Sequence, residues 1–316
     1  MAGDQVKVRP LIESELEDAD RIMRTAFGTF FGLPDPTTFM GDACYVRSRW
    51  KASPTSAFAA EVDGRLAGSN FATRWGSFGF FGPLSLDPTF WDRGFASTLM
   101  EPVIESLDTW GVTHAGLFTF AQSPKHIGLY QKFGFRPRSL TLLLERPVRM
   151  TDVQSEGWST YSELDEHQRS EALSACQHLT DGIYPGLDVT PEVISIEQQL
   201  LGETILIADL NLLGFATCHI GRGSEAGSGV CYIKFGAAAP GPSAQEHFRR
   251  LLEACEVFAA GAGATRIMAG VNAARPEAYE EMLSAGFRIS FTGISMHRFN
   301  EPGFSRPGVF VIDDWR

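Results

Sequence analysis

The chain has 316 residues, so its length favours two domains of roughly 150 residues each. Its formal net charge is −11, which argues against a protein that binds the phosphate backbone of nucleic acid. The five cysteines are scattered and lack Cys-x-x-Cys spacing, so neither a disulfide framework nor a zinc site is expected.

Segments that direct a chain to a membrane are not expected either. Residues 1–24 carry charges throughout, unlike a signal peptide. The most apolar run, residues 205–220, is interrupted by Asp209, Asn211 and His219, and it is too short and too polar to span a bilayer. We therefore expect a metal-free protein of the reducing cytoplasm with no membrane partner.

Hydrophobic spacing in the first half predicts an alternation of helices and strands. Residues 13–27 carry apolar side chains at helical spacing, and Asp63-Gly64 marks a turn between two strands. The expected elements, in chain order, are a helix over 13–27, strands over 57–62, 66–72 and 77–86, a helix over 93–109, a strand over 112–120, a short helix over 125–133 and a strand over 140–144. This order indicates a mixed α+β fold.

The two halves of the chain resemble each other. A shift of 152 residues aligns residues 99–118 with 251–270, and it sets one Gly-Phe-Arg triplet on another. Chance likeness of two α/β halves is the alternative, but one offset that holds across helix, strand and helix end favours a duplication. The sequence predicts a first domain over residues 1–149 and a second over 150–316.

The most informative segment runs from Leu84 to Ala96 and reads LSLDPTFWDRGFA. An apolar strand there continues through a turn with Pro and Gly into an amphipathic helix. Amide N–H groups at a helix start form an anion-binding concavity, which the positive end of the helix dipole reinforces. Gly94 and Ala96 have little or no side chain, so a pyrophosphate can approach the main chain. An ordinary helix start with a solvated Arg93 is the alternative.

Together with LYQKFGFRP of residues 129–137, this segment resembles the two signature blocks of the GNAT superfamily, the acetyl-CoA-dependent N-acyltransferases. The resemblance implies two tandem GNAT-like domains of α+β class, each with a mixed, mostly antiparallel sheet flanked by helices. It also implies acetyl-CoA as cosubstrate, with no metal. The residues that it assigns to the cofactor are Leu84, Leu86, Trp91, Asp92, Arg93, Gly94, Phe95, Ala96, Ser97 and Ser123.

The match to the family pattern is incomplete. Trp91 stands where the family has Arg or Gln, and Ser123 and His126 depart from the second block, whereas Tyr130 matches it. In the family this tyrosine protonates the leaving thiolate, and a phenol with a pKa of about 10 suits that role. The resemblance therefore implies a catalytic role for Tyr130, and a core tyrosine that caps a helix is the alternative.

A general base is harder to find in this sequence. The strand predicted over 77–86, which carries the base in many members of the family, has no ionisable side chain. Glu61, His114 and His126 are the remaining candidates, acting through water. Acceptor specificity in the family comes from the first helices and loops. Here the aromatic residues between positions 27 and 50 predict an apolar acceptor pocket, a core or a dimer surface.

The second half departs from the family at the aligned cofactor turn. Glu246 and Phe248 replace the small residues at the helix start, and Met282 stands at the tyrosine position. A carboxylate repels phosphate, and a phenyl ring fills the space that the main chain needs. This half is therefore predicted to be a degenerate copy with a structural or substrate-shaping role.

These features together predict an N-acetyltransferase that transfers an acetyl group from acetyl-CoA to a small-molecule amine, using the N-terminal domain. Nucleic acid is not an expected partner, and a homodimer remains open. The alternative is a catalytically silent acyl-CoA-binding or assembly module. Trp91 and the lack of an ionisable side chain in the strand predicted over 77–86 favour this alternative.

Overall fold

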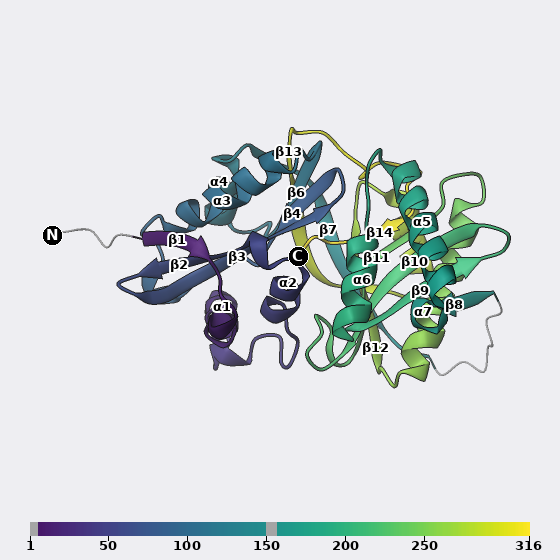
Figure 1. Cartoon of the computed structure of the whole chain (residues 1–316), viewed down its shortest axis with the longest axis horizontal. Helices are drawn as coiled ribbons and strands as arrows, with labels where there is room; N and C mark the ends of the chain where they lie inside the picture. The colour runs from purple at the N-terminus through teal and green to yellow at the C-terminus, as the bar shows by residue number, and fades with distance from the viewer. Residues whose placement is uncertain (1–5, 150–156) are drawn as a thin grey trace.

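The computed structural model describes residues 6–149 and 157–316, and it has an α+β architecture (Figure 1). The elements of the first half are β1 (Val6–Pro10), α1 (Leu16–Phe30), α2 (Val46–Ala52), β2 (Ala57–Val62), β3 (Arg65–Trp75), β4 (Phe78–Phe81), β5 (Ser85–Leu86), α3 (Phe95–Thr109), β6 (His114–Thr119), α4 (Pro124–Gln131) and β7 (Phe135–Pro147). Those of the second half are β8 (Trp158–Thr160), α5 (Glu166–Ile183), α6 (Thr190–Gln199), β9 (Gly202–Ala208), β10 (Leu212–Gly221), β11 (Gly227–Ala238), α7 (Ala244–Gly261), β12 (Arg266–Asn272), α8 (Pro276–Ser284), β13 (Arg288–Arg298) and β14 (Val311–Ile312).

The same order of elements recurs in the two halves. Three consecutive strands, β2-β3-β4, are followed by α3, β6, α4 and β7, and likewise β9-β10-β11 are followed by α7, β12, α8 and β13. The corresponding helices α3 and α7 each bury an apolar stripe, which includes Leu99 and Val103 in α3 and Phe248 and Leu251 in α7. The repeated order agrees with the duplication that the sequence predicts.

One mixed sheet runs through the whole molecule. Its strand order is β1-β2-β3-β4-β6-β13-β7-β12-β11-β10-β9-β8. The β4–β6 and β11–β12 pairs are parallel, and the other strand pairs within the described residues are antiparallel. The predicted α+β class with a mixed, mostly antiparallel sheet is confirmed.

The last strand of each half lies inside the sheet of the other half. β13 pairs with β6 on one side and β7 on the other, and β7 in turn pairs with β12. Figure 1 shows β7 and β13 in the middle of the molecule, with α1 and α5 toward opposite ends. Without β13, the hydrogen-bonding edge of β6 would have no neighbour, so neither half completes its sheet alone. The division between residues 149 and 150 falls at the margin of the described residues and stays a prediction.

One predicted strand is broken in the structure. The segment predicted as one strand over 77–86, in which Gly82-Pro83 suggests a bulge, forms β4 and, after an interruption at Gly82-Pro83, the two-residue β5. Proline has no N–H to donate to a strand ladder, which accounts for the break at this point. Among the helices of the described residues, none has both the length and the apolar composition that crossing a membrane requires.

Candidate functional site

The strands β4 and β6 separate in the middle of the first half. They pair as parallel neighbours from Phe78 opposite His114 to Phe80 opposite Gly116, and no further. Both β4 and β5 pair with β3 on the other side, and beyond Pro83 the chain keeps this neighbour alone, with Leu86 opposite Gly68. A gap in the sheet therefore opens between β5 and the end of β6, and it gives a ligand access to main-chain groups that a continuous ladder would occupy.

A cavity of about 560 Å³ lies beside this gap. Its walls come from α1, β5, the turn over residues 90–97 and the start of α4. Nine of the ten residues that the sequence assigns to the cofactor line it, namely Leu84, Leu86, Trp91, Asp92, Gly94, Phe95, Ala96, Ser97 and Ser123. The tenth, Arg93, is not among the lining residues, and its guanidinium lies 5.5 Å from the ring centre of Phe90.

The turn before α3 is held in shape by side chains. The Asp87 carboxylate accepts hydrogen bonds from the Thr89 main-chain N–H (2.9 Å) and hydroxyl (2.7 Å). The Trp91 indole N–H donates to the Leu86 carbonyl (2.9 Å), which ties the turn to β5. The tryptophan at this position therefore helps to fix the turn through its indole N–H.

The N-terminus of α3 is open at the cavity wall. Asp92 and Gly94 have positive φ angles of 64° and 84°, and within the described chain no side chain caps the first turn of this helix. The first N–H groups of a helix lack intrahelical acceptors, and the helix dipole adds partial positive charge there. An uncapped helix start in the wall of a cavity is a suitable site for a phosphate group.

Two cations line the same cavity. Lys125 Nζ lies 2.6 Å from the Asp92 carboxylate and 5.6 Å from the ring centre of Trp91. Lys132, seven residues further along the chain, lines the wall as well. The Asp92 charge, which would repel a phosphate, is therefore partly neutralised by Lys125.

A second, smaller cavity of about 330 Å³ adjoins the first. The two share Phe27, Leu84, Phe120 and His126 as lining residues. Four residues of the smaller cavity come from the second half or the chain end, and the sequence analysis did not foresee them: Met268, Ser290, Phe291 and Arg316. Ser290 and Phe291 lie on β13 and Met268 lies on β12, and both strands reach this place by pairing with β7, which no local pattern in the sequence encodes.

Tyr130 lines the smaller cavity and not the larger one. Its ring is buried and packs edge-on against Phe81, at 5.7 Å between ring centres. Burial raises the pKa of Tyr130 to about 12, although a hydrogen bond with Thr119 opposes the shift. The phenol is therefore a hydrogen-bond donor throughout the neutral pH range.

The three base candidates lie in different surroundings. Glu61 is bound to the Arg9 guanidinium at 2.6 Å, and His114 is buried against His297 with 2.9 Å between ring nitrogens, its pKa lowered to about 4 by burial. Neither is among the described residues that line the two cavities. His126 lines both, and its Nδ1 is 2.6 Å from the Ser123 hydroxyl. Burial lowers the pKa of His126 below its ordinary value.

The aromatic residues between positions 27 and 50 divide between cavity walls and core. Phe27, Phe31, Phe39 and Tyr45 line the smaller cavity. The Trp50 indole instead donates to the Leu11 carbonyl at 2.8 Å and packs against the core of the first half.

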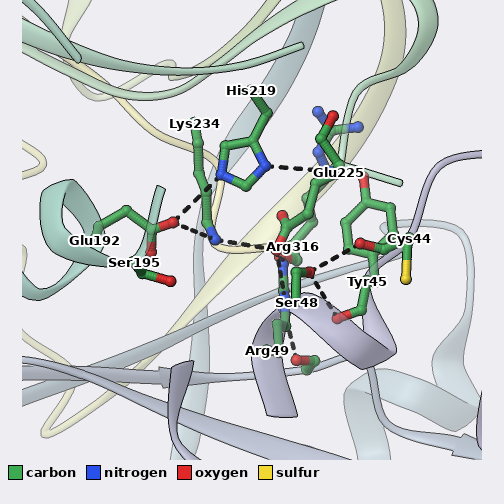
Figure 2. Close-up of polar contacts among 12 residues, drawn as sticks. Cys44, Tyr45, Ser48, Arg49, Glu192, Ser195, His219, Glu225, Lys234 and Arg316 are labelled. Carbon is green, nitrogen blue, oxygen red and sulfur yellow. Dashed lines mark hydrogen bonds and ion pairs between the residues drawn. The ribbon is translucent and has the colours of Figure 1, made fainter. Parts of the chain in front are cut away.

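A buried chain of charges connects the second half to the gap in the sheet (Figure 2). The Lys234 ammonium lies 2.8 Å from a Glu192 oxygen and 3.0 Å from a Glu225 oxygen. Glu225 accepts two hydrogen bonds from Arg49, and Arg49 also donates to the Gly82 carbonyl at 2.6 Å. Glu225 of the second half therefore fixes Arg49 of α2, and Arg49 in turn binds the main chain at the break between β4 and β5.

The carboxylates of this chain are ionised despite their burial. Burial alone would raise the pKa of Glu192, but the charge of Lys234 and the hydrogen bond with His219 outweigh it and lower that pKa to about 2. Burial likewise opposes ionisation of Glu225, yet Arg49 and Lys234 hold the pKa of Glu225 well below its ordinary value. Each charge depends on its partner, since an unpaired buried charge is strongly unfavourable.

The comparisons with known proteins agree with this geometry. Residues 21–135 match the profile of the Acetyltransferase (GNAT) family. A Pyrococcus horikoshii protein assigned as an acetyltransferase is similar over 98% of this chain and 95% of its own, with a TM-score of 0.68 and 15% identity. A GCN5-related N-acetyltransferase from Sphaerobacter thermophilus is similar over 98% of both chains, with a TM-score of 0.62 and 14% identity. The chain matches none of the curated proteins.

Residues 21–135 therefore match the GNAT acetyltransferase family, and the fold of the whole chain is similar to that of these two solved acetyltransferases. Acetyl transfer from acetyl-CoA is the activity of this family. Within the described residues, no group of three or more His, Cys, Asp or Glu side chains is placed to hold a metal ion.

Replacing Lys234 by Met tests the buried charges. The variant leaves Glu192 and Glu225 without their shared cation, so the free energy of unfolding should fall by about 3–5 kcal/mol at neutral pH. An ionised Glu192 with a pKa of about 2 stabilises the fold above the unfolded value of 4.5, and this contribution is lost as the pH falls below 4.5. The difference in free energy of unfolding between the wild type and the variant, measured by urea unfolding, should therefore be smaller at about pH 4 than at about pH 7.

Arg21→Met is the control for this substitution. Arg21 forms an exposed pair with Asp18, at 2.9 Å, and its loss should change stability by less than about 1 kcal/mol. Equal losses in the two variants would contradict a structural role for the buried chain.

Proposed function

We propose that this protein is an N-acetyltransferase that moves an acetyl group from acetyl-CoA to a small-molecule amine at the site of the first half. The observation that carries the proposal is the uncapped start of α3 in the wall of the larger cavity, which adjoins the apolar cavity of Tyr130. One cavity suits a diphosphate, and its neighbour suits an acyl group and an acceptor.

The larger cavity would hold the nucleotide end of acetyl-CoA. Main-chain N–H groups of Gly94, Phe95 and Ala96 would bind the diphosphate, with Lys125 and Lys132 as nearby cations. The pantetheine arm would enter the gap between β5 and β6, where Leu84 is common to both cavities. The thioester would then lie next to Tyr130 and His126.

The chemistry needs an uncharged amine and a protonated leaving group. The amine lone pair attacks the thioester carbonyl carbon, a C–N bond forms and the C–S bond breaks, and one amine proton goes to a base. Tyr130 would donate its phenolic proton to the departing sulfur, and it regains a proton from the solvent. Because burial raises its pKa, the phenol still carries its proton at neutral pH when the thiolate forms.

We propose His126 as the group that accepts the amine proton. Of the three candidates from the sequence, it is the one that lines both cavities. Its lowered pKa keeps the imidazole neutral at neutral pH, which is the form that can accept a proton.

The second half would serve as a scaffold and as one wall of the acceptor site. Phe248 and Met282 are fully buried in its core, and Glu246 forms an exposed ion pair with Arg249 at 2.6 Å. None of these side chains suits the binding of a diphosphate. The unpaired cysteines, which form no disulfide with one another, agree with a cytoplasmic location.

A catalytically silent acyl-CoA-binding module is the second candidate, because the broken strand β4–β5 carries no ionisable side chain. Calorimetric titration with acetyl-CoA, followed by measurement of CoA release with a panel of amines, separates the two. Tight binding without turnover on any amine would favour the silent module.

Gly94→Glu tests the diphosphate site. Gly94 has a φ of 84°, and a glutamate there would place a negative charge at the helix start, so affinity for acetyl-CoA should fall at least about 100-fold by calorimetry. Gly111→Glu is the matched control, because Gly111 follows the other end of α3 with a φ of 63° and open space around it. The assignment is wrong if the two variants lose affinity equally.

Tyr130→Phe tests the proton donor. The variant keeps the ring and its packing but loses the hydroxyl, so kcat should fall about 100-fold or more, while the Kd for acetyl-CoA stays within about twofold. Steady-state kinetics and calorimetry measure the two quantities. An unchanged kcat would remove Tyr130 from the mechanism.

His126→Gln tests the base through the pH profile. In the wild type, kcat at saturating amine should fall as the pH drops, with a midpoint below the ordinary histidine pKa of 6.5, because protonated imidazole cannot accept a proton. The variant should be slower at neutral pH and should lack this acidic limb. A variant that retains the limb would show that another group titrates.

A further inference from the structure

The smaller cavity differs in charge from the molecule as a whole. The chain carries a net charge of −11, yet none of the described residues that line this cavity is an aspartate or a glutamate. Tyr45 and Tyr130 both line it, and burial raises the pKa of each to about 12, so both remain neutral. At neutral pH, its lining side chains therefore supply no negative charge.

The cation of this cavity is already paired. Arg316 lines the wall, and its guanidinium donates to the Asp314 carboxylate at 3.1 Å and lies 4.3 Å from the ring centre of Tyr232. An alkylammonium ion that entered the cavity would lose its water and find no carboxylate side chain in the described lining, and the Arg316 main-chain oxygen already accepts a hydrogen bond from Arg49. Burying such an ion is costly, whereas a neutral amine avoids this cost.

Aromatic rings form much of the wall. Phe291, on β13, lies 5.9 Å from Phe31 and 6.1 Å from Phe120 between ring centres, and Phe27 and Phe39 stack at 5.5 Å. These rings already contact one another, and the edges and faces that they turn to the cavity can pack against a further aromatic ring. The volume of about 330 Å³ is at the lower end of the range of roughly 300–1,000 Å³ for small-molecule sites, so it suits an acceptor with one ring.

We propose that the acceptor is a weakly basic primary amine on a single aromatic body, of the aniline class, and that Phe291 of the second half determines this specificity. This inference rests on the proposed function of the site. The ring of the acceptor occupies the aromatic walls, and its amino group points to the gap that the two cavities share. Polyamines, aminoglycosides and amino acids carry additional charges, so we expect the smaller cavity to exclude them as acceptors.

Two isomeric amines separate charge from size. 4-Methylaniline and benzylamine have the same atoms, but the first is neutral at pH 7 and the second is an ammonium ion. The KM for 4-methylaniline should be at least about tenfold lower at neutral pH, and the difference should narrow as the pH rises toward the ordinary alkylamine pKa of about 10. Spermidine should be the poorest substrate of the panel.

Phe291→Ala tests the wall that the second half supplies. The KM for 4-methylaniline should rise at least about tenfold, while the KM for acetyl-CoA, which reports an intact fold, should stay the same. Ile289→Ala is the matched control on the same strand, because Ile289 is 47% exposed and does not line the cavity. Phe291→Leu should have a KM for 4-methylaniline much closer to that of the wild type than Phe291→Ala has.

Two results would overturn the inference and leave the proposed function intact: acetylation of benzylamine or spermidine with a lower KM than 4-methylaniline, or an unchanged KM in Phe291→Ala. Failure of the proposed function looks different. In that case acetyl-CoA binds without acetylation of any amine, or it does not bind.

Discussion

The sheet of this protein depends on an exchange of strands between its halves. β13 lies between β6 and β7, and β7 lies between β13 and β12, so each half is completed by the last strand of the other. In the proposed function, this constraint explains why the second half, which is predicted to lack a usable phosphate turn, is still required. Its strand supplies the neighbour of β6, and with it Ser290 and Phe291 at the edge of the acceptor cavity.

A second link between the halves is electrostatic. Lys234, Glu225 and Arg49 form a buried chain that ends on the Gly82 carbonyl, at the point where β4 and β5 separate. Hydrogen bonds to charged groups are stronger than those between neutral groups, particularly in a buried setting. The gap that admits a ligand to the sheet is therefore held open by groups far from the cofactor turn in sequence. Binding of the cofactor and support by the second half are two parts of one arrangement.

Patterns in the sequence predicted those parts of the site whose residues are close together along the chain. Residues 84–97 follow one another in a strand, a turn and a helix start, so eight of the nine residues assigned in this segment gather around one cavity. The resemblance to the GNAT family supplied Ser123, in the same wall, and Tyr130, in the neighbouring cavity. The break at Gly82-Pro83 is larger than the bulge that the sequence suggests, because the loss of β6 as a neighbour, while β3 is kept on the other side, is a tertiary event. The walls from Met268 and Phe291 depend on the pairing of β12 and β13 with β7, and the contact of His114 with His297 depends on β13 lying beside β6. The alignment of the two halves could not reveal these pairings.

The most direct test of this account is a crystal structure of the protein with CoA bound. We expect the diphosphate within hydrogen-bonding distance of the main-chain N–H groups of Gly94 to Ala96, with the pantetheine arm in the gap between β5 and β6 and the thiol near Tyr130. Diphosphate density at the start of α7 in the second half, or an empty first cavity with the ligand bound elsewhere, would contradict it.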